Sequence, residues 1–277
     1  MPKLGEFTIR VLKAFKANQG LLLAGAVAYY ALLSIVPLLI LFVIGFSHFM
    51  DADELLATIA RYVEWFVPGQ GQAIVGTLST FLDNRGVLGG VLLVTMVFFS
   101  SLAFSVLESA MSVIFLHRLA HHRRSFLVSF SLPYLYILLL GIGLVAVTLA
   151  TAELDHYASD NVAPVLFYLM GIVMELLLLT SLYYVMPVGR LTFKHALLGG
   201  ATATVLWEVT RHVLLWYFGS LSKVSQVYGS FATVIVILLS FEFAAILLLL
   251  GAQVIAEYER LQRGEPVQPP TPVRTDP

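Results

Sequence analysis

Long apolar stretches alternate with short polar segments along most of this chain. A helix that crosses a bilayer needs about 20 mainly apolar residues, and six stretches are long enough. They lie at roughly 21–47, 87–115, 126–151, 164–187, 196–218 and 228–256. The first is too long for the core of a signal peptide, and no small-residue cleavage site follows it. The pattern predicts an all-α integral membrane protein with six transmembrane helices, the first of them uncleaved.

The segment before the first apolar run has the spacing of an amphipathic helix. Its apolar residues share one helical face and its basic residues lie elsewhere. The apolar set is Leu4, Phe7, Val11, Leu12 and Phe15, and the basic set is Arg10, Lys13 and Lys16. We expect residues 1–20 to form a short cytoplasmic helix that lies on anionic lipid headgroups.

The polar segment at 51–86 also has helical spacing. Asp51 can cap a helix, and the pair Pro68-Gly69 ends it before a second apolar face begins at Ile74. We expect two amphipathic external helices that cap the bundle or lie on the outer leaflet. An envelope protein partner through residues 51–86 is a further hypothesis. Residues 21–258 then form one transmembrane domain that includes this insert.

Residues 259–277 are expected to be a disordered cytoplasmic tail, because their last part is rich in proline and has no apolar periodicity.

Composition agrees with a membrane protein. Hydrophobic residues make up 59% of the chain and charged residues 12%, whereas soluble domains have about 45–50% and about 25%. The net charge of −1 provides no basic field for nucleic acid. Cysteine is absent, which excludes disulfides, thiolate metal sites and cysteine nucleophiles.

The distribution of Lys and Arg predicts the orientation of the helices. Twelve of the sixteen fall on the side that holds both termini, and three fall on the other side; the last is Arg211, inside the fifth run. Cytoplasmic loops are enriched in these residues. Both termini are therefore expected in the cytoplasm.

Several ionisable residues interrupt the apolar runs. At 1.5 Å of rise per residue, Glu175, Glu208 and Glu242 lie about 16, 18 and 21 Å into the fourth, fifth and sixth runs, near the middle of a hydrocarbon core of about 30 Å. Arg211 and His212 share a helical face with Glu208. Such residues usually face the bundle interior or a water-filled cavity. One interpretation is a polar cavity between the last three spans that binds a headgroup, an ion or a proton. The other is hydrogen bonding that only holds the helices together.

The other candidate motifs are weaker indications of a functional site. Pro37 frees a backbone carbonyl in the first run, and Ser34 can satisfy a freed group. His117 and His121 have a spacing that permits a metal ion, but arginines rather than acids surround them. We therefore predict no metal and no cofactor. Nothing in the chain resembles a nucleophile elbow, a phosphate-binding loop or a zinc-protease helix.

The chain resembles the YihY/BrkB family of bacterial inner-membrane proteins, formerly misnamed ribonuclease BN. The resemblance lies in "AYYALLSIVPLL", "LWEVTRH", "VYGSFATVIVILL" and "LLLLGAQVIAE". The positions that match the family pattern are Tyr29, Tyr30, Ser34, Pro37, Trp207, Glu208, Tyr228, Gly229, Ser230 and Gly251. Many members look to have an aromatic residue in place of Glu242 and an acid in place of Gln253.

The resemblance implies a multi-pass protein of the bacterial inner membrane, with links to envelope integrity and virulence and no settled activity. Our leading hypothesis is transport or handling of a lipid or other amphipathic envelope substrate, with membrane lipids as partners. The alternative is a non-catalytic membrane scaffold for an envelope-biogenesis or virulence partner. The ribonuclease label has no support in these residues, and we expect no enzymatic activity and no nucleic-acid partner.

Overall fold

The structure is a computed structural model, and it describes residues 4–47, 51–66, 71–83, 85–115, 135, 142, 163–186, 191–220 and 230–263. All regular secondary structure in these residues is α-helical. The helices are α1 (Leu4–Ala17), α2 (Gly20–Phe46), α3 (Ala52–Phe66), α4 (Gly71–Asp83), α5 (Arg85–Ile114), α7 (Ala163–Val185), α8 (Phe193–Ser220) and α10 (Ser230–Gln262).

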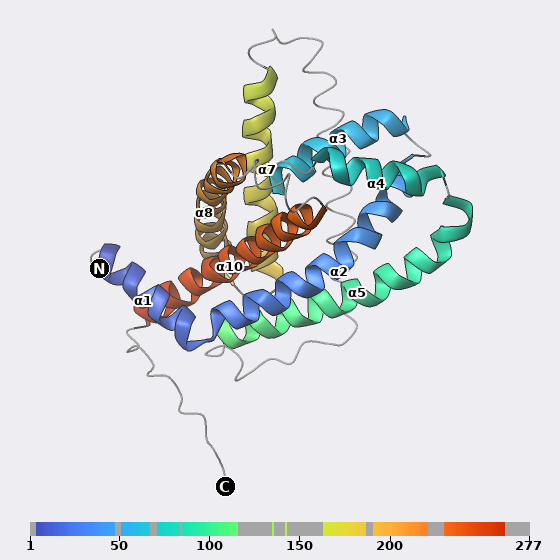
Figure 1. Ribbon diagram of the computed structural model, residues 1–277. Helices are drawn as coiled ribbons and strands as arrows, with labels where there is room; N and C mark the ends of the chain where they lie inside the picture. Colours follow the sequence, from blue (N-terminus) through green and yellow to red (C-terminus); the bar gives the residue numbers. More distant parts are fainter. Residues whose placement is uncertain are drawn as a thin grey trace.

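Helix α10 is the centre of the described bundle. It packs against α2 and α5 on one side and against α8 on the other, and α7 packs against α8 (Figure 1). The apolar residues of α10 continue all round the helix, as they do in the other long helices, which suits contact with neighbours or with lipid on every side. Leu249, Ala252, Ile255 and Ala256 of α10 are fully buried in the main core.

Three glycines let α7, α8 and α10 approach one another closely. A Cβ on Gly251 of α10 would collide with the Tyr183 hydroxyl of α7 and approach the carbonyl oxygen of Gly199 in α8 to 3.0 Å. A Cβ on Gly200 would collide with Thr180, and one on Gly199 would collide with the Ile255 side chain of α10. The Tyr183 hydroxyl donates to the Leu248 carbonyl oxygen at 2.7 Å. Small residues of this kind are how membrane helices pack tightly, and they give a structural reason for glycine at 251.

Helices α1 and α2 are joined by a sharp bend. Gln19 adopts a left-handed conformation with φ of 54°, and the axes of the two helices differ by 66°. The Phe15 ring lies where a Cβ of Gly20 would be, so glycine is needed directly after the turn. The bend therefore falls between α1 and α2, whereas α2 continues as a helix through Pro37.

Helices α3 and α4 form a cap over one end of the bundle. They pack against each other and against α2, and Leu55, Ile59 and Leu78 form a second core with Val43 of α2 and Val236 of α10. The apolar faces of both helices are thus used in packing. Both helices therefore pack on the bundle, and their position on the external side stays a prediction.

The described helices follow the order expected from the sequence, and six transmembrane spans stay a prediction. By length and composition, two of them can cross a membrane, at Tyr168–Val185 and Val234–Gln262, and the bent pair α1 and α2 makes a third if it counts as one span. The third apolar run, 126–151, lies outside the described residues except for positions 135 and 142, and so does most of the C-terminal tail.

Candidate functional site

A polar cluster joins α7 and α8 around Glu208. The Tyr168 hydroxyl of α7 donates to Oε2 of Glu208 at 2.6 Å, and an Arg211 amino group donates to the same oxygen at 3.1 Å. The Arg211 guanidinium also lies over the Tyr168 ring, 5.3 Å from its centroid. His212 approaches the backbone oxygen of Glu208 at 2.7 Å through Nδ1. The helical spacing had predicted that Glu208, Arg211 and His212 share a face; Tyr168 is an addition that only the packing reveals.

The charged pair of this cluster is largely shielded, because the side chains of Glu208 and Arg211 are 16% and 12% exposed. The two carboxylate oxygens of Glu208 have different surroundings. Oε2 accepts two hydrogen bonds, while Oε1 is buried and accepts none from the described residues. A buried acceptor without a partner is uncommon in folded proteins. Oε1 is therefore a buried acceptor that the described residues leave without a hydrogen bond.

The other two predicted acids have different surroundings. Glu175 has a buried carboxylate but lies seven residues after Tyr168, about 10 Å along α7. Glu242 is on an exposed part of α10, beside the exposed Phe243. Depth along a helix gives the height of a residue and not the direction of its side chain, so the exposure of Glu242 could not be predicted from depth.

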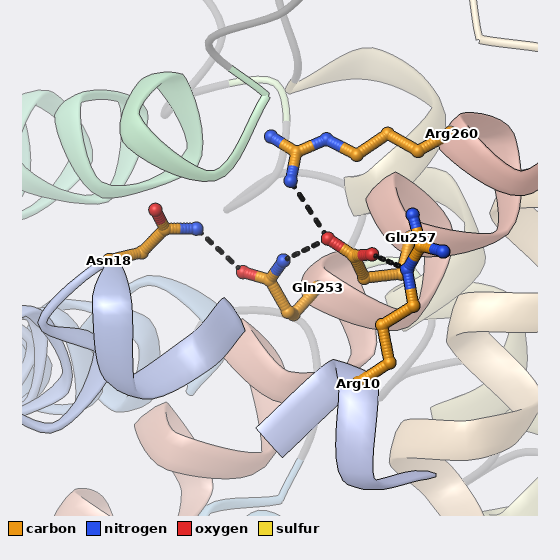
Figure 2. Close-up of polar contacts among 5 residues, drawn as sticks. All are labelled: Arg10, Asn18, Gln253, Glu257 and Arg260. Atoms are coloured by element: carbon orange, nitrogen blue, oxygen red, sulfur yellow. Dashed lines mark hydrogen bonds and ion pairs between the residues drawn. The ribbon is translucent and has the colours of Figure 1, made fainter. Parts of the chain in front are cut away.

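The structure also contains a second, more deeply buried polar cluster, at the C-terminal end of α10 (Figure 2). Glu257 accepts from Arg10 of α1 at 2.7 Å and from Arg260 at 2.8 Å. Gln253, one turn earlier, donates to Glu257 at 3.4 Å and accepts from Asn18 at 2.9 Å. The residues Gln253 and Glu257 are fully buried.

This second cluster shows which face of α1 packs on the bundle, while its position on a membrane stays a prediction. Arg10 was expected to lie on lipid headgroups, but its side chain is mostly buried against Glu257. Val11 and Phe15 are also buried, whereas Leu12 is exposed. The inner face of α1 is thus fixed to α10 and α2, and only its outer face resembles the expected interfacial helix.

A neighbouring contact ties α8 to the same end of α10. His195 of α8 approaches Glu259 at 3.0 Å, and its ring packs edge-on against Tyr258. The sequence contained a partial signal for these contacts, because Gln253, Glu257 and Arg260 follow one another at helical spacing. Their partner Arg10 lies too far away in the chain to be found from spacing.

The positions that match the family pattern have different surroundings. Trp207 is buried and Tyr29 is 56% exposed, with its ring edge-on to Tyr30. The Ser34 hydroxyl donates to the Ala31 carbonyl, so it does not satisfy the Leu33 carbonyl that Pro37 frees. Ser230 begins α10. Four further residues of interest lie outside the described residues: Tyr228, Gly229, His117 and His121.

Three relatives found by comparison with known proteins share one description, UPF0761 membrane protein. A UPF0761 membrane protein of Azotobacter vinelandii is 29% identical over 93% of this chain, which spans 64% of that protein. One from Photobacterium profundum is 26% identical over 88% of this chain and 79% of its own length. One from Legionella pneumophila is 27% identical over 90% of this chain, which spans 61% of that protein.

No solved structure matches this chain. The model of the family described as virulence factor BrkB matches residues 11–275, nearly the whole chain. The chain therefore belongs to the virulence factor BrkB family, and it is a membrane protein.

Proposed function

We propose that this protein binds and moves a lipid or another amphipathic envelope substrate at the Glu208 cluster, defined as Tyr168, Glu208, Arg211 and His212. The observation that carries the proposal is the buried Oε1 of Glu208, which accepts no hydrogen bond from the described residues. A charged side chain within an apolar membrane helix costs a few kcal/mol of insertion free energy. Substrate binding is a reason to retain it.

The chemistry of the cluster suits an amphipathic headgroup. A hydroxyl or ammonium group of the substrate would donate to Oε1 of Glu208. A phosphate or carboxylate would be attracted to Arg211. The Tyr168 ring contacts the Arg211 guanidinium and helps to hold it in place. Exposed apolar residues of α8, including Val205 and Val209, would contact the acyl chains.

The proposal includes a location and a topology. It places the protein in the bacterial inner membrane with six spans and both termini in the cytoplasm, as the Lys and Arg distribution predicts. Roles in envelope integrity and virulence would follow from substrate handling. No reaction is part of the proposal, because a bound substrate that is moved without chemistry needs no catalytic group.

Phospholipid movement in proteoliposomes tests this function. Fluorescent phosphatidylglycerol and phosphatidylcholine would be added, and their exposure to a membrane-impermeant quencher would be followed over time. We expect the protein to accelerate movement of at least one of them. Glu208→Gln and Arg211→Gln should slow this movement about tenfold or more, because hydrogen bonds to charged groups contribute about 1.5–3 kcal/mol.

Glu242→Gln is the matched control, since it neutralises an acid on an exposed part of α10. It should retain the parental rate. Parental rates in both cluster variants, or no acceleration of either lipid by the parent protein, would contradict the proposal.

A scaffold for an envelope partner is the second candidate function. The α3–α4 cap favours it, because its apolar residues pack on α2 and α10 while Glu54, Arg61 and Gln72 remain exposed on its outside. Such a cap presents a fixed polar surface to a partner. Replacement of these three exposed residues should then abolish the scaffold's envelope function in cells without changing the thermal stability of the bundle. Retained function in this variant would contradict the scaffold.

A further inference from the structure

One face of α1 is exposed and mixes apolar with basic residues. Ile9 and Leu12 are 54% and 52% exposed, and Lys13 and Lys16 are exposed beside them. These four residues follow the spacing i, i+3, i+4 and i+7, which places them on one side of a helix. We call them the outer face of α1. The exposed Glu6 lies in the first turn of α1, where the helix dipole favours an acid.

The opposite face of α1 cannot turn outward without breaking buried contacts. Val11 and Phe15 are buried in the core, and Arg10 pairs with Glu257. Asn18 donates to the fully buried Gln253 at 2.9 Å. The direction of the outer face is therefore set by packing and does not depend on a membrane being present.

The bend brings the end of this face close to the first turn of α2. The axis of α1 lies at 66° to that of α2, closer to perpendicular than to parallel. Leu21 and Leu22, in the first turn of α2, are 64% and 69% exposed. Exposed leucines at the start of a long apolar helix are suited to contact with acyl chains. The outer face of α1 is thus close in the chain to exposed leucines that suit contact with hydrocarbon.

We propose that the outer face of α1 binds anionic phospholipid headgroups in the leaflet at this end of the bundle. Lys13 and Lys16 would contact the phosphates, while Ile9 and Leu12 would enter the boundary between headgroups and acyl chains. Helices with this division of residues lie in the membrane interface, and each lysine near an anionic surface increases the affinity about fivefold. The proposal does not depend on the Glu208 cluster or on substrate movement.

A fluorophore on α1 tests this binding. The chain has no cysteine, so Ala17→Cys gives a single labelling site on an exposed residue of α1 that is not part of the outer face. The labelled full-length protein would be placed in phosphatidylcholine nanodiscs that contain a few per cent of a spin-labelled quencher lipid. The quencher would be either phosphatidylglycerol or phosphatidylcholine. We expect phosphatidylglycerol to quench at several-fold lower mole fraction.

The lysines can then be tested against a matched control. Lys13→Gln with Lys16→Gln should remove most of this preference and leave quenching by phosphatidylcholine unchanged. Lys194→Gln, which removes an exposed lysine at the start of α8, should retain the preference. Equal quenching by both lipids in the parent, an unchanged preference in the double variant, or no quenching by either lipid would each overturn the proposal.

Discussion

Arg10 and Glu257 are 247 residues apart in the chain, yet Nε of Arg10 donates to Oε2 of Glu257 at 2.7 Å. The Glu257 side chain is only 1% exposed. Because Arg260 occupies the other oxygen of the same carboxylate, Glu257 holds two arginines from two helices. This carboxylate is the main polar connection between α1 and the bundle.

We predict that Glu257→Gln destabilises the protein more than Arg10→Gln. The first change leaves two arginines near each other without their shared acid, and loss of one partner from a buried pair costs about 3–5 kcal/mol. The second leaves Glu257 paired with Arg260. Thermal unfolding in detergent, followed by the fraction that stays monodisperse, measures both. Glu6→Gln on exposed α1 should leave the midpoint unchanged; equal midpoints for all three variants would contradict the assignment.

Gly251→Ala should destabilise the packing of α7, α8 and α10. The added Cβ would collide with the Tyr183 hydroxyl, and forced overpacking costs about 1–3 kcal/mol. Gly25→Ala is the control, because a Cβ there meets nothing within 4 Å. Tyr183→Phe removes the colliding oxygen, so the double variant should be more stable than the sum of the two single changes predicts. Simple additivity would contradict this contact.

The absence of cysteine allows a direct test of orientation. Glu54→Cys is on the exposed side of α3, and Lys16→Cys is on the outer face of α1. A membrane-impermeant thiol reagent added to intact spheroplasts should label the first, and should label the second only after permeabilisation. Labelling of both positions in intact spheroplasts would contradict the predicted cytoplasmic N-terminus.

Stability of the α3–α4 cap should fall at high pH because of Tyr62. Burial raises the pKa of this phenol from 10 to about 12, against the lowering effect of Arg61. The folded protein therefore holds the phenol proton more tightly than the unfolded chain, so the contribution is complete below pH 10 and is lost as pH rises toward 12. Thermal midpoints between pH 9 and 12 should fall more steeply in the parent than in Tyr62→Phe. Parallel curves would contradict a buried phenol.

Apolar length and helical spacing predict most of the described fold. The order and approximate bounds of α2, α5, α7, α8 and α10 follow from the long runs, and α1, α3 and α4 follow from amphipathic spacing. These features are local, so a single sequence contains them.

Contacts between distant helices could not be predicted in the same way. The pairing of Tyr168 with Glu208 depends on how α7 and α8 are aligned, and the exposure of Glu242 depends on how α10 is rotated. Arg10 contributed to the prediction that the N-terminus is cytoplasmic. Its pairing with the buried Glu257 could be found only in the folded structure. Rotation and alignment of helices are set by packing of the whole bundle.

The central claim is that Glu208 receives an amphipathic substrate, and native mass spectrometry of the purified protein tests it most directly. Parent, Glu208→Gln and Glu242→Gln would be exchanged into the same detergent and scored for bound lipid. We predict that the parent and Glu242→Gln retain a bound lipid, and that Glu208→Gln loses it when equal amounts of monodisperse protein are compared. Equal lipid occupancy in Glu208→Gln and the parent would contradict the account.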